Sequence, residues 1–191
     1  MTTLETGSGA SSIVFAGRGA SHTVISPAPD EHERIVAWCE HRGVDTGGLR
    51  FLAESSDLGL TGGWSPEPLD LVLVDGAHLF PFPALDWFHT SRHHKVGGRV
   101  VLDDAFLPSV NMVVRFLRSS PSWEFEGAIS YRTVVFRKLN EDVGYDAIGT
   151  RFDRRARFGY LPLPQRVIAV ARHSLIDRSP RVQRVLARLR G

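Results

Sequence analysis

The stretch Leu71-Val72-Leu73-Val74-Asp75-Gly76-Ala77-His78 decides the fold class of this chain. Its consecutive apolar residues predict a buried strand, and the acid, glycine and histidine that follow predict that the strand stops there. In open α/β sheets, ligands bind in the crevice at the carboxyl ends of the strands. We therefore expect Asp75 and His78 to lie at a binding site.

A second stretch, Val100-Val101-Leu102-Asp103-Asp104, repeats the pattern of an apolar strand that ends in acids. The carboxyl ends of parallel strands meet at one edge of a sheet, so the two stretches predict a single site. His78 supplies a candidate general base there, because imidazole titrates near neutral pH. A strand-end aspartate can also simply cap the following turn, and this alternative stays open for each acid taken alone.

Along the chain, apolar patterns typical of strands alternate with apolar patterns typical of helices. Strands are expected at 2–5, 22–26, 49–53, 69–74 and 99–102. Helices are expected between them, over 13–16, 31–42 and 84–94, and after the last of them, over 109–118. Two further strands, at 123–129 and 133–138, surround a short turn and predict an antiparallel hairpin. This order predicts an α/β fold with a mostly parallel sheet and helices on both faces.

Length and composition exclude several classes of protein. The 191 residues suit one domain with a substantial core. No apolar run approaches the ~20 residues that span a membrane, and the polar, glycine-rich N-terminus does not resemble a signal peptide. Cys39 is the only cysteine, which excludes an internal disulfide and favours a reducing compartment. We therefore expect a cytoplasmic protein.

Charge is distributed unevenly along the chain. Residues 151–191 contain eleven arginines and two aspartates, although the whole chain has a net charge of only +2. Basic amphipathic stretches are expected at about 165–176 and 180–190. We therefore divide the chain into a domain at 1–140 and an Arg-rich, partly helical extension at 141–191. The extension is expected to bind an anionic membrane surface or a protein partner, including a second copy of the chain, or to be merely solvated.

Nucleic acid is disfavoured as a partner of the extension, because few aromatic side chains accompany the arginines for base stacking.

A glycine turn, Glu5-Thr6-Gly7-Ser8-Gly9-Ala10-Ser11, lies between the first expected strand and helix. Glycines let the backbone approach a ligand, and a helix N-terminus adds N–H groups and partial positive charge. No Gly-Lys-Ser/Thr follows, so the turn is not a P-loop, and it lacks the third glycine of the dinucleotide fingerprint. The preceding acid suits a ligand with an ammonium group. A turn that uses glycine for geometry alone is the alternative.

The pattern Glu5-x-Gly7-x-Gly9-x-Ser11 resembles motif I of the class I S-adenosylmethionine-dependent methyltransferases, and residues 1–140 as a whole are similar to that family. The resemblance implies a Rossmann-like, seven-stranded methyltransferase sheet with a C-terminal antiparallel hairpin. It also implies S-adenosylmethionine as the cofactor. Glu5, Gly7 and Gly9 would contact its methionine part, and Ser11 would lie beside it.

Three further cofactor positions are expected. Ser26 stands at the end of the second strand, where family members usually carry an acid that holds the ribose hydroxyls. Asp30 or Glu31 are substitutes for that acid, or they simply stabilise the following helix. Ser55 follows the third strand, where the family places its adenine contacts. Asp75 is expected to contact the cofactor as well.

The strand ends D-G-x-H and D-D are most similar to the small metal-dependent O-methyltransferases that act on macrolide sugars and cephalosporins. That resemblance implies that Asp75, Asp103 and Asp104 bind Mg²⁺ and that His78 is the general base. Magnesium favours such oxygen ligands and would lower the pKa of a bound hydroxyl. Asp103 is shorter than the glutamate that is common at its position in the family. The candidates for an acceptor pocket, or for core packing, are Trp64, Phe80, Phe82 and Trp87.

The expected activity is therefore transfer of a methyl group to a hydroxyl of a small molecule or sugar. Two alternatives stay open. One is a metal-independent methyltransferase, in which the aspartates bind cofactor and substrate. The other is a catalytically inactive protein of the same fold, which binds a membrane or protein partner through its basic extension.

Overall fold

The structure is a computed structural model that describes residues 1–62, 67–141 and 161–178, with side chains described as far as Ala171. The chain divides into two units, Met1–Thr150 and Arg151–Gly191, and each is treated by itself. Trp64 and the amphipathic stretch expected at 180–190 lie outside the described residues.

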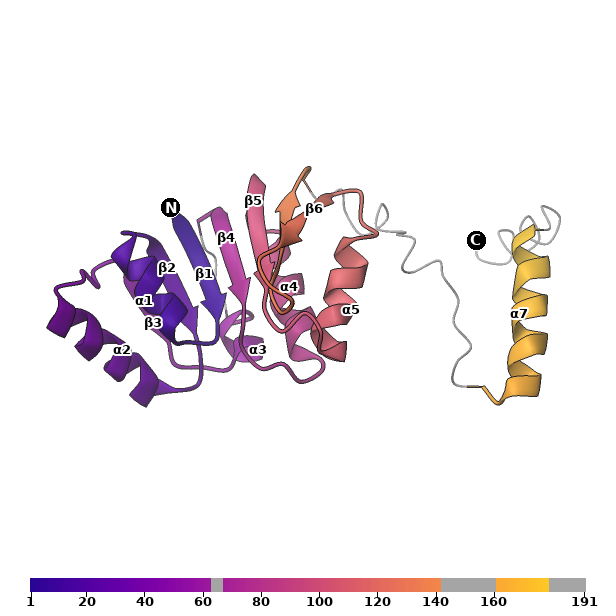
Figure 1. Ribbon diagram of the computed structural model, residues 1–191, viewed down its shortest axis with the longest axis horizontal. Coiled ribbons are helices and arrows are strands. Elements are labelled where there is room, and N and C mark those ends of the chain that lie inside the picture. The colour runs from indigo at the N-terminus through magenta and orange to yellow at the C-terminus, as the bar shows by residue number, and fades with distance from the viewer. Residues whose placement is uncertain (63–66, 142–160, 179–191) are drawn as a thin grey trace. The chain divides into compact units, whose positions relative to one another are not determined.

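Within the described part of the first unit, a seven-stranded sheet has the order β3-β2-β1-β4-β5-β7-β6 (Figure 1). The strands are β1 (Thr2–Thr6), β2 (Ser21–Ile25), β3 (Leu49–Leu52), β4 (Leu69–Val74), β5 (His94–Leu102), β6 (Trp123–Ala128) and β7 (Val134–Lys138). Strands β1 to β5 pair in parallel, and β7 pairs antiparallel with both β5 and β6. The predicted mostly parallel, Rossmann-like sheet with a C-terminal hairpin is confirmed.

Helices connect the strands and cover the sheet. They are α1 (Ala10–Gly17), α2 (Pro29–Arg42), α3 (Ser56–Gly59), α4 (Phe82–Ser91) and α5 (Pro108–Leu117). One apolar cluster joins α1 to α2 through Ala16, Ile35 and the buried Cys39. The main cluster joins the central strands to α5, with Leu4, Val72 and Val110 completely buried. Burial of such side chains contributes about 1.5–3 kcal/mol each to folding.

The boundary between α4 and β5 differs from the prediction. The helix expected over 84–94 ends at Ser91, and β5 begins at His94 instead of near residue 99. His94 is 2% exposed, and its ring nitrogens lie 3.1 and 3.2 Å from the carbonyl oxygens of Thr90 and Arg99. Burial lowers the pKa of His94 to about 4, so the imidazole is neutral. A buried neutral histidine is compatible with a strand, but hydrophobic periodicity does not reveal that the strand begins at this polar residue.

The second unit contains α7 (Leu163–Arg178), which covers the amphipathic stretch expected at 165–176. Its apolar side chains Leu163, Val167, Ile168 and Val170 are exposed. No helix in the described ranges is both long enough and apolar enough to cross a membrane.

Candidate active site

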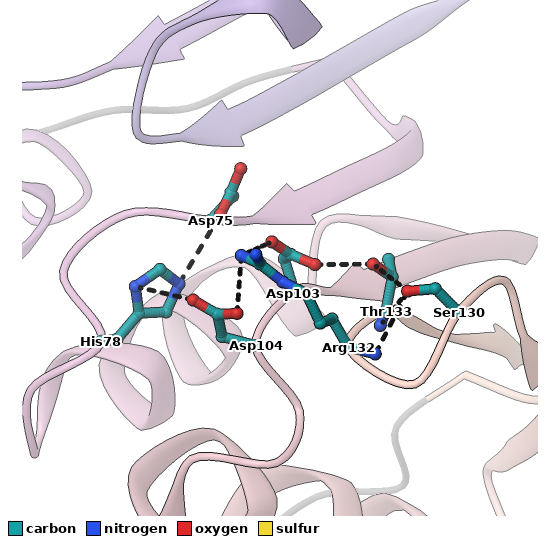
Figure 2. A network of polar contacts seen from close by, with 7 residues as sticks. All are labelled: Asp75, His78, Asp103, Asp104, Ser130, Arg132 and Thr133. Atoms are coloured by element: carbon teal, nitrogen blue, oxygen red, sulfur yellow. Dashed lines mark hydrogen bonds and ion pairs between the residues drawn. The ribbon is translucent and has the colours of Figure 1, made fainter.

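Four polar side chains meet at the carboxyl edge of the central strands (Figure 2). Asp75 follows β4, and Asp103 and Asp104 follow β5, which pairs with β4 in parallel. His78 Nε2 lies 3.6 Å from Asp75 Oδ1, and His78 Nδ1 lies 3.6 Å from Asp104 Oδ2. The structure therefore brings together the acids and the histidine that the sequence analysis singled out.

Nε2 of His78 is buried and has no hydrogen-bond partner. A buried polar atom without a partner destabilises the folded state by about 1–3 kcal/mol, so it marks a position where a ligand group fits. The loop that carries His78 is held in place, because the Ser109 hydroxyl on α5 donates a hydrogen bond to the His78 carbonyl oxygen. The backbone at His78 is thus anchored to α5, and one ring nitrogen is available to a ligand.

Two residues of the β6–β7 turn complete the network, and the sequence analysis missed both. Nη2 of Arg132 lies 2.7 Å from Asp104 Oδ1 and 3.3 Å from Asp103 Oδ2. The Thr133 hydroxyl donates a 2.6 Å hydrogen bond to Asp103 Oδ1. The signal for both is the hairpin register: Leu102 pairs antiparallel with Val134, so the residues before β7 lie opposite those after β5.

Asp104 has a backbone φ of +50°, the left-handed region that few residues other than glycine adopt. Aspartate tolerates this conformation better than most residues, and such backbone conformations are found at functional sites. The conformation directs one carboxylate to both His78 and Arg132, so a local backbone feature orients the site.

The carboxyl groups differ in their electrostatic environment. Burial, followed by the charge of Asp103, raises the pKa of Asp75 to about 6. Burial also opposes ionisation of Asp103, but the hydrogen bond from Thr133 and the charge of Arg132 outweigh it and lower the pKa of that carboxyl. At neutral pH, Asp103 is therefore firmly ionised, whereas Asp75 titrates just below neutrality.

The residues do not fit a bound divalent cation in this arrangement. Across the described residues, no three His, Cys, Asp or Glu side chains are grouped so that they could hold a metal ion. The guanidinium of Arg132 instead lies against both Asp103 and Asp104. The predicted magnesium site at Asp75, Asp103 and Asp104 is therefore not supported.

The glycine turn lies directly beside this network. Gly7 has a φ of +95°, and a Cβ added to it would lie 2.4 Å from the carbonyl oxygen of Asp75. Only glycine fits at this close approach between the end of β1 and the end of β4. A Cβ added to Gly9 would meet nothing within 4 Å, so the turn is open at the N-terminus of α1. Ser11 lies half-buried in the first turn of that helix.

Glu5 is placed beneath the turn instead of on its surface. It is 1% exposed, accepts a hydrogen bond from the Ser12 hydroxyl, and lies 3.2 Å from Nε2 of His22. Nδ1 of His22 in turn lies 2.7 Å from the Thr3 hydroxyl. In this arrangement Glu5 supports the turn from within and presents no exposed carboxylate to a ligand.

Glu31, on the first turn of α2, reaches the glycine turn at the carboxyl end of β2. The Ser8 hydroxyl lies 2.5 Å from Glu31 Oε2 and 3.1 Å from the hydroxyl of Ser26. Asp30 is exposed, and Ser55 is half-buried at the start of α3. Glu31 therefore supplies a carboxylate near the carboxyl end of β2, where the residue that follows the strand is Ser26 and not an acid.

Asp86, on α4, is completely buried, with the hydroxyls of Ser56 and Thr6 as its polar neighbours. Burial raises the pKa of this carboxyl. The sequence analysis did not single it out, because an acid inside a helix usually faces solvent.

Trp87 packs against the core, and its ring lies 4.8 Å from that of Phe116. Among the aromatic residues that were candidates for an acceptor pocket or for core packing, Trp87 is therefore a core residue.

Exposed apolar side chains follow the same strand ends and turn that carry the polar network. Leu79 and Phe80 follow β4, Phe106 follows β5, and Tyr131 lies in the β6–β7 turn. Phe80 is 71% exposed and Tyr131 is 83% exposed. The rings of Phe106 and Tyr131 are 6.1 Å apart. A ligand at the network would therefore meet an apolar border.

Proteins of known structure share this fold. The chain is similar to the O-methyltransferase TomG from Streptomyces achromogenes, involved in tomaymycin synthesis and solved with S-adenosylmethionine, at 18% identity over 73% of each chain with a TM-score of 0.58. It is also similar to a methyltransferase from Geobacter sulfurreducens, at 14% identity over 73% of this chain and 71% of that chain with a TM-score of 0.59.

A third similar structure is an rRNA methylase from Streptococcus thermophilus, at 10% identity over 73% of this chain and 88% of that chain with a TM-score of 0.54. No family model and no curated protein matches the chain. At these identities the similarity establishes a Rossmann-like methyltransferase fold, and the reaction must be argued from the site.

Proposed function

We propose that this protein is an S-adenosylmethionine-dependent methyltransferase that methylates a hydroxyl of a small molecule or sugar. The observation that supports the proposal is the contact between the glycine turn and the carboxyl end of β4. Gly7 lies against the carbonyl oxygen of Asp75, and His78 lies three residues further on. A cofactor on the turn would therefore lie next to a candidate base.

The residues of the turn fit S-adenosylmethionine. The open backbone at Gly9 and Ser11 would receive the methionine part at the N-terminus of α1. The carboxylate of Glu31, with Ser26, would accept hydrogen bonds from the ribose hydroxyls. Ser55 would lie near the adenine and Asp75 near the bound cofactor. The bound cofactor supplies an electrophilic methyl group on a sulfonium.

His78 would act as the general base. Nδ1 lies 3.6 Å from Asp104 and Nε2 lies 3.6 Å from Asp75. In the tautomer that carries the proton on Nδ1, Nε2 would accept the proton of the acceptor hydroxyl. The bound cofactor would supply the methyl group to this oxygen, and positioning of the acceptor by the site would contribute much of the rate. The exposed apolar side chains of Phe80, Phe106 and Tyr131 would contact an apolar part of the acceptor.

Cofactor binding tests the first half of the proposal. We expect isothermal titration calorimetry of the whole chain with S-adenosylmethionine to show one site. Glu31→Gln should weaken it by about 10- to 150-fold, because a charge-assisted hydrogen bond contributes about 1.5–3 kcal/mol. Asp30→Asn, an exposed neighbour on the same helix turn, is the matched control. Absence of binding at millimolar cofactor would overturn the proposal.

The base is tested separately. His78→Gln should keep cofactor affinity but lower methyl transfer, measured with labelled cofactor and a panel of phenols and sugars, by about 10²–10⁴-fold. A His78→Gln variant that transfers the methyl group at the wild-type rate would contradict the role of His78.

A further inference from the structure

The guanidinium of Arg132 lies against both Asp103 and Asp104, the two acids that follow β5 (Figure 2). Its Nη2 contacts one oxygen of Asp103 and one oxygen of Asp104, at 3.3 and 2.7 Å. A single guanidinium nitrogen thus bridges two carboxylates from one strand end. The position resembles that of an ion shared between ligands, but here the positive charge belongs to the protein.

The backbone holds Arg132 at this position from both sides. The Ala105 amide donates a 2.7 Å hydrogen bond to the Arg132 carbonyl oxygen, which ties the turn to the segment after β5. The neighbouring Thr133 donates to the second oxygen of Asp103. The position of the guanidinium therefore does not depend on the flexible Arg132 side chain alone, because the β5–β7 pairing already places the Arg132 backbone opposite the acids.

Electrostatics favours this arrangement over two unpaired aspartates. Asp103 and Asp104 are adjacent in sequence and Asp75 lies at the same edge, so their negative charges repel one another. Arginine stays ionised at every physiological pH, and its fork of N–H groups can contact two carboxylates. A divalent ion at the same oxygens would have to displace Arg132 against charge repulsion.

We propose that Arg132 takes the place of a divalent cation in this site. It neutralises Asp103 and Asp104 and holds Asp104 beside Nδ1 of His78, so that the site works without a bound metal. The catalytic part of this inference rests on the proposed function, but the exclusion of metal does not. Arg132 is a positioning residue, because it acts on His78 through Asp104.

Metal binding by variants tests the inference without any turnover. Mn²⁺ replaces Mg²⁺ as the probe, and electron paramagnetic resonance measures free Mn²⁺ in the presence of the whole chain. We expect no saturable binding by the wild type up to about 1 mM. Arg132→Met should expose the carboxylates and create one site at least about tenfold tighter, a gain of about 1.4 kcal/mol. Arg132→Lys, which keeps the charge, should bind as little Mn²⁺ as the wild type.

Arg137 provides a matched control in the same hairpin. It also pairs with two carboxylates, those of Glu124 and Glu126, and its side chain is 42% exposed against 46% for Arg132. Glu126 also pairs with Arg99, at 2.7 Å, so it stays neutralised when Arg137 is removed. Arg137→Met should therefore leave Mn²⁺ binding unchanged, which would show that the gain belongs to the strand-end acids. Thermal unfolding verifies that each variant is folded.

Two results would overturn the inference. One is a wild-type chain that binds a single Mn²⁺ as tightly as Arg132→Met does, because the arginine would then yield to the metal. The other is an Arg132→Met variant that is folded and gains no Mn²⁺ affinity. Failure of the proposed function is recognised separately, as absence of S-adenosylmethionine binding in the metal-free titration.

Discussion

At the scale of single residues, the two strand ends supply carboxyl groups with different properties. Asp75 has a pKa raised to about 6, mainly by burial, whereas the pKa of Asp103 is lowered by Thr133 and Arg132 despite burial. Groups whose environments separate their pKa values can take different roles in one reaction. Asp103 is a permanent negative charge, and Asp75 changes its charge close to physiological pH.

The raised pKa of Asp75 predicts a pH-dependent stability. The folded state holds the proton between about pH 4 and about pH 6 while the unfolded state releases it, so stability falls as pH rises through this window. Compared with Asp75→Asn, the wild type should lose on the order of 1 kcal/mol between pH 4 and pH 7.5, a value discounted because the side chain is 38% exposed. Urea unfolding of both chains at the two pH values measures the difference.

An Asp75→Asn chain whose stability relative to the wild type stays constant over that range would contradict the assignment.

The sequence predicted the acids and His78 because their type and place at strand ends are visible in one dimension. Glu31 was one of two candidates for the acid near the end of β2, and its contact with Ser8 distinguishes it from Asp30. The burial of Glu5 beside His22 and the pairing of Arg132 with the acids were not predicted. Both depend on contacts between residues far apart in the sequence, and residue type alone does not reveal such contacts.

At the scale of elements, the glycine turn and the end of β4 pack directly against each other. Gly7→Ala would put a Cβ at 2.4 Å from the Asp75 carbonyl oxygen in a backbone conformation that L-residues rarely adopt. We expect a loss of about 1–3 kcal/mol in the free energy of unfolding, together with weaker cofactor binding. Differential scanning calorimetry and the cofactor titration measure the two effects.

Gly17→Ala is the control for that substitution. Gly17 ends α1, its added Cβ would meet nothing within 4 Å, and it carries no positive φ. This change should be neutral or stabilise the helix by about 0.5–1 kcal/mol. Equal stability losses in both variants would show that the close approach at Gly7 has no special effect.

Elements with a strong apolar run, such as β4, were predicted with correct bounds, because burial on both faces leaves an unambiguous pattern. The start of β5 and the short helix α3 were not. Both segments are short mixtures of polar residues, glycine and a single apolar residue, so neither has a hydrophobic period. Buried hydrogen bonds of His94 stabilise the start of β5, and α3 is a single turn.

At the scale of the whole molecule, the sheet-containing unit is joined to an Arg-rich unit with its own helix. Helix α7 exposes Val167 and Ile168 in a region that carries eleven arginines between 151 and 191. We propose that this region binds anionic membrane surfaces, where apolar burial and attraction to lipid charge act together.

Vesicle co-sedimentation tests this proposal. The whole chain should bind vesicles of phosphatidylglycerol and phosphatidylcholine, and Val167→Asp should weaken binding by about tenfold through lost apolar burial and added negative charge. Gln165→Asp makes the same charge change at an exposed polar position of α7 and should weaken binding less. Equal effects of the two substitutions, or no binding by the wild type, would contradict it.

The antiparallel pairing of strand β7 has a consequence for which part of the site can change independently of the sheet. The tip of the hairpin, residues 129–133, carries both the guanidinium at the acids and the aromatic ring of Tyr131 at the border. The pairing of β5 with β7 begins only at Val134, so substitutions in the tip leave the sheet register unchanged. The charge and the apolar side chain that the tip brings to this edge can therefore be changed by substitutions at a few positions, without any change in the strands that hold Asp75, Asp103 and the glycine turn.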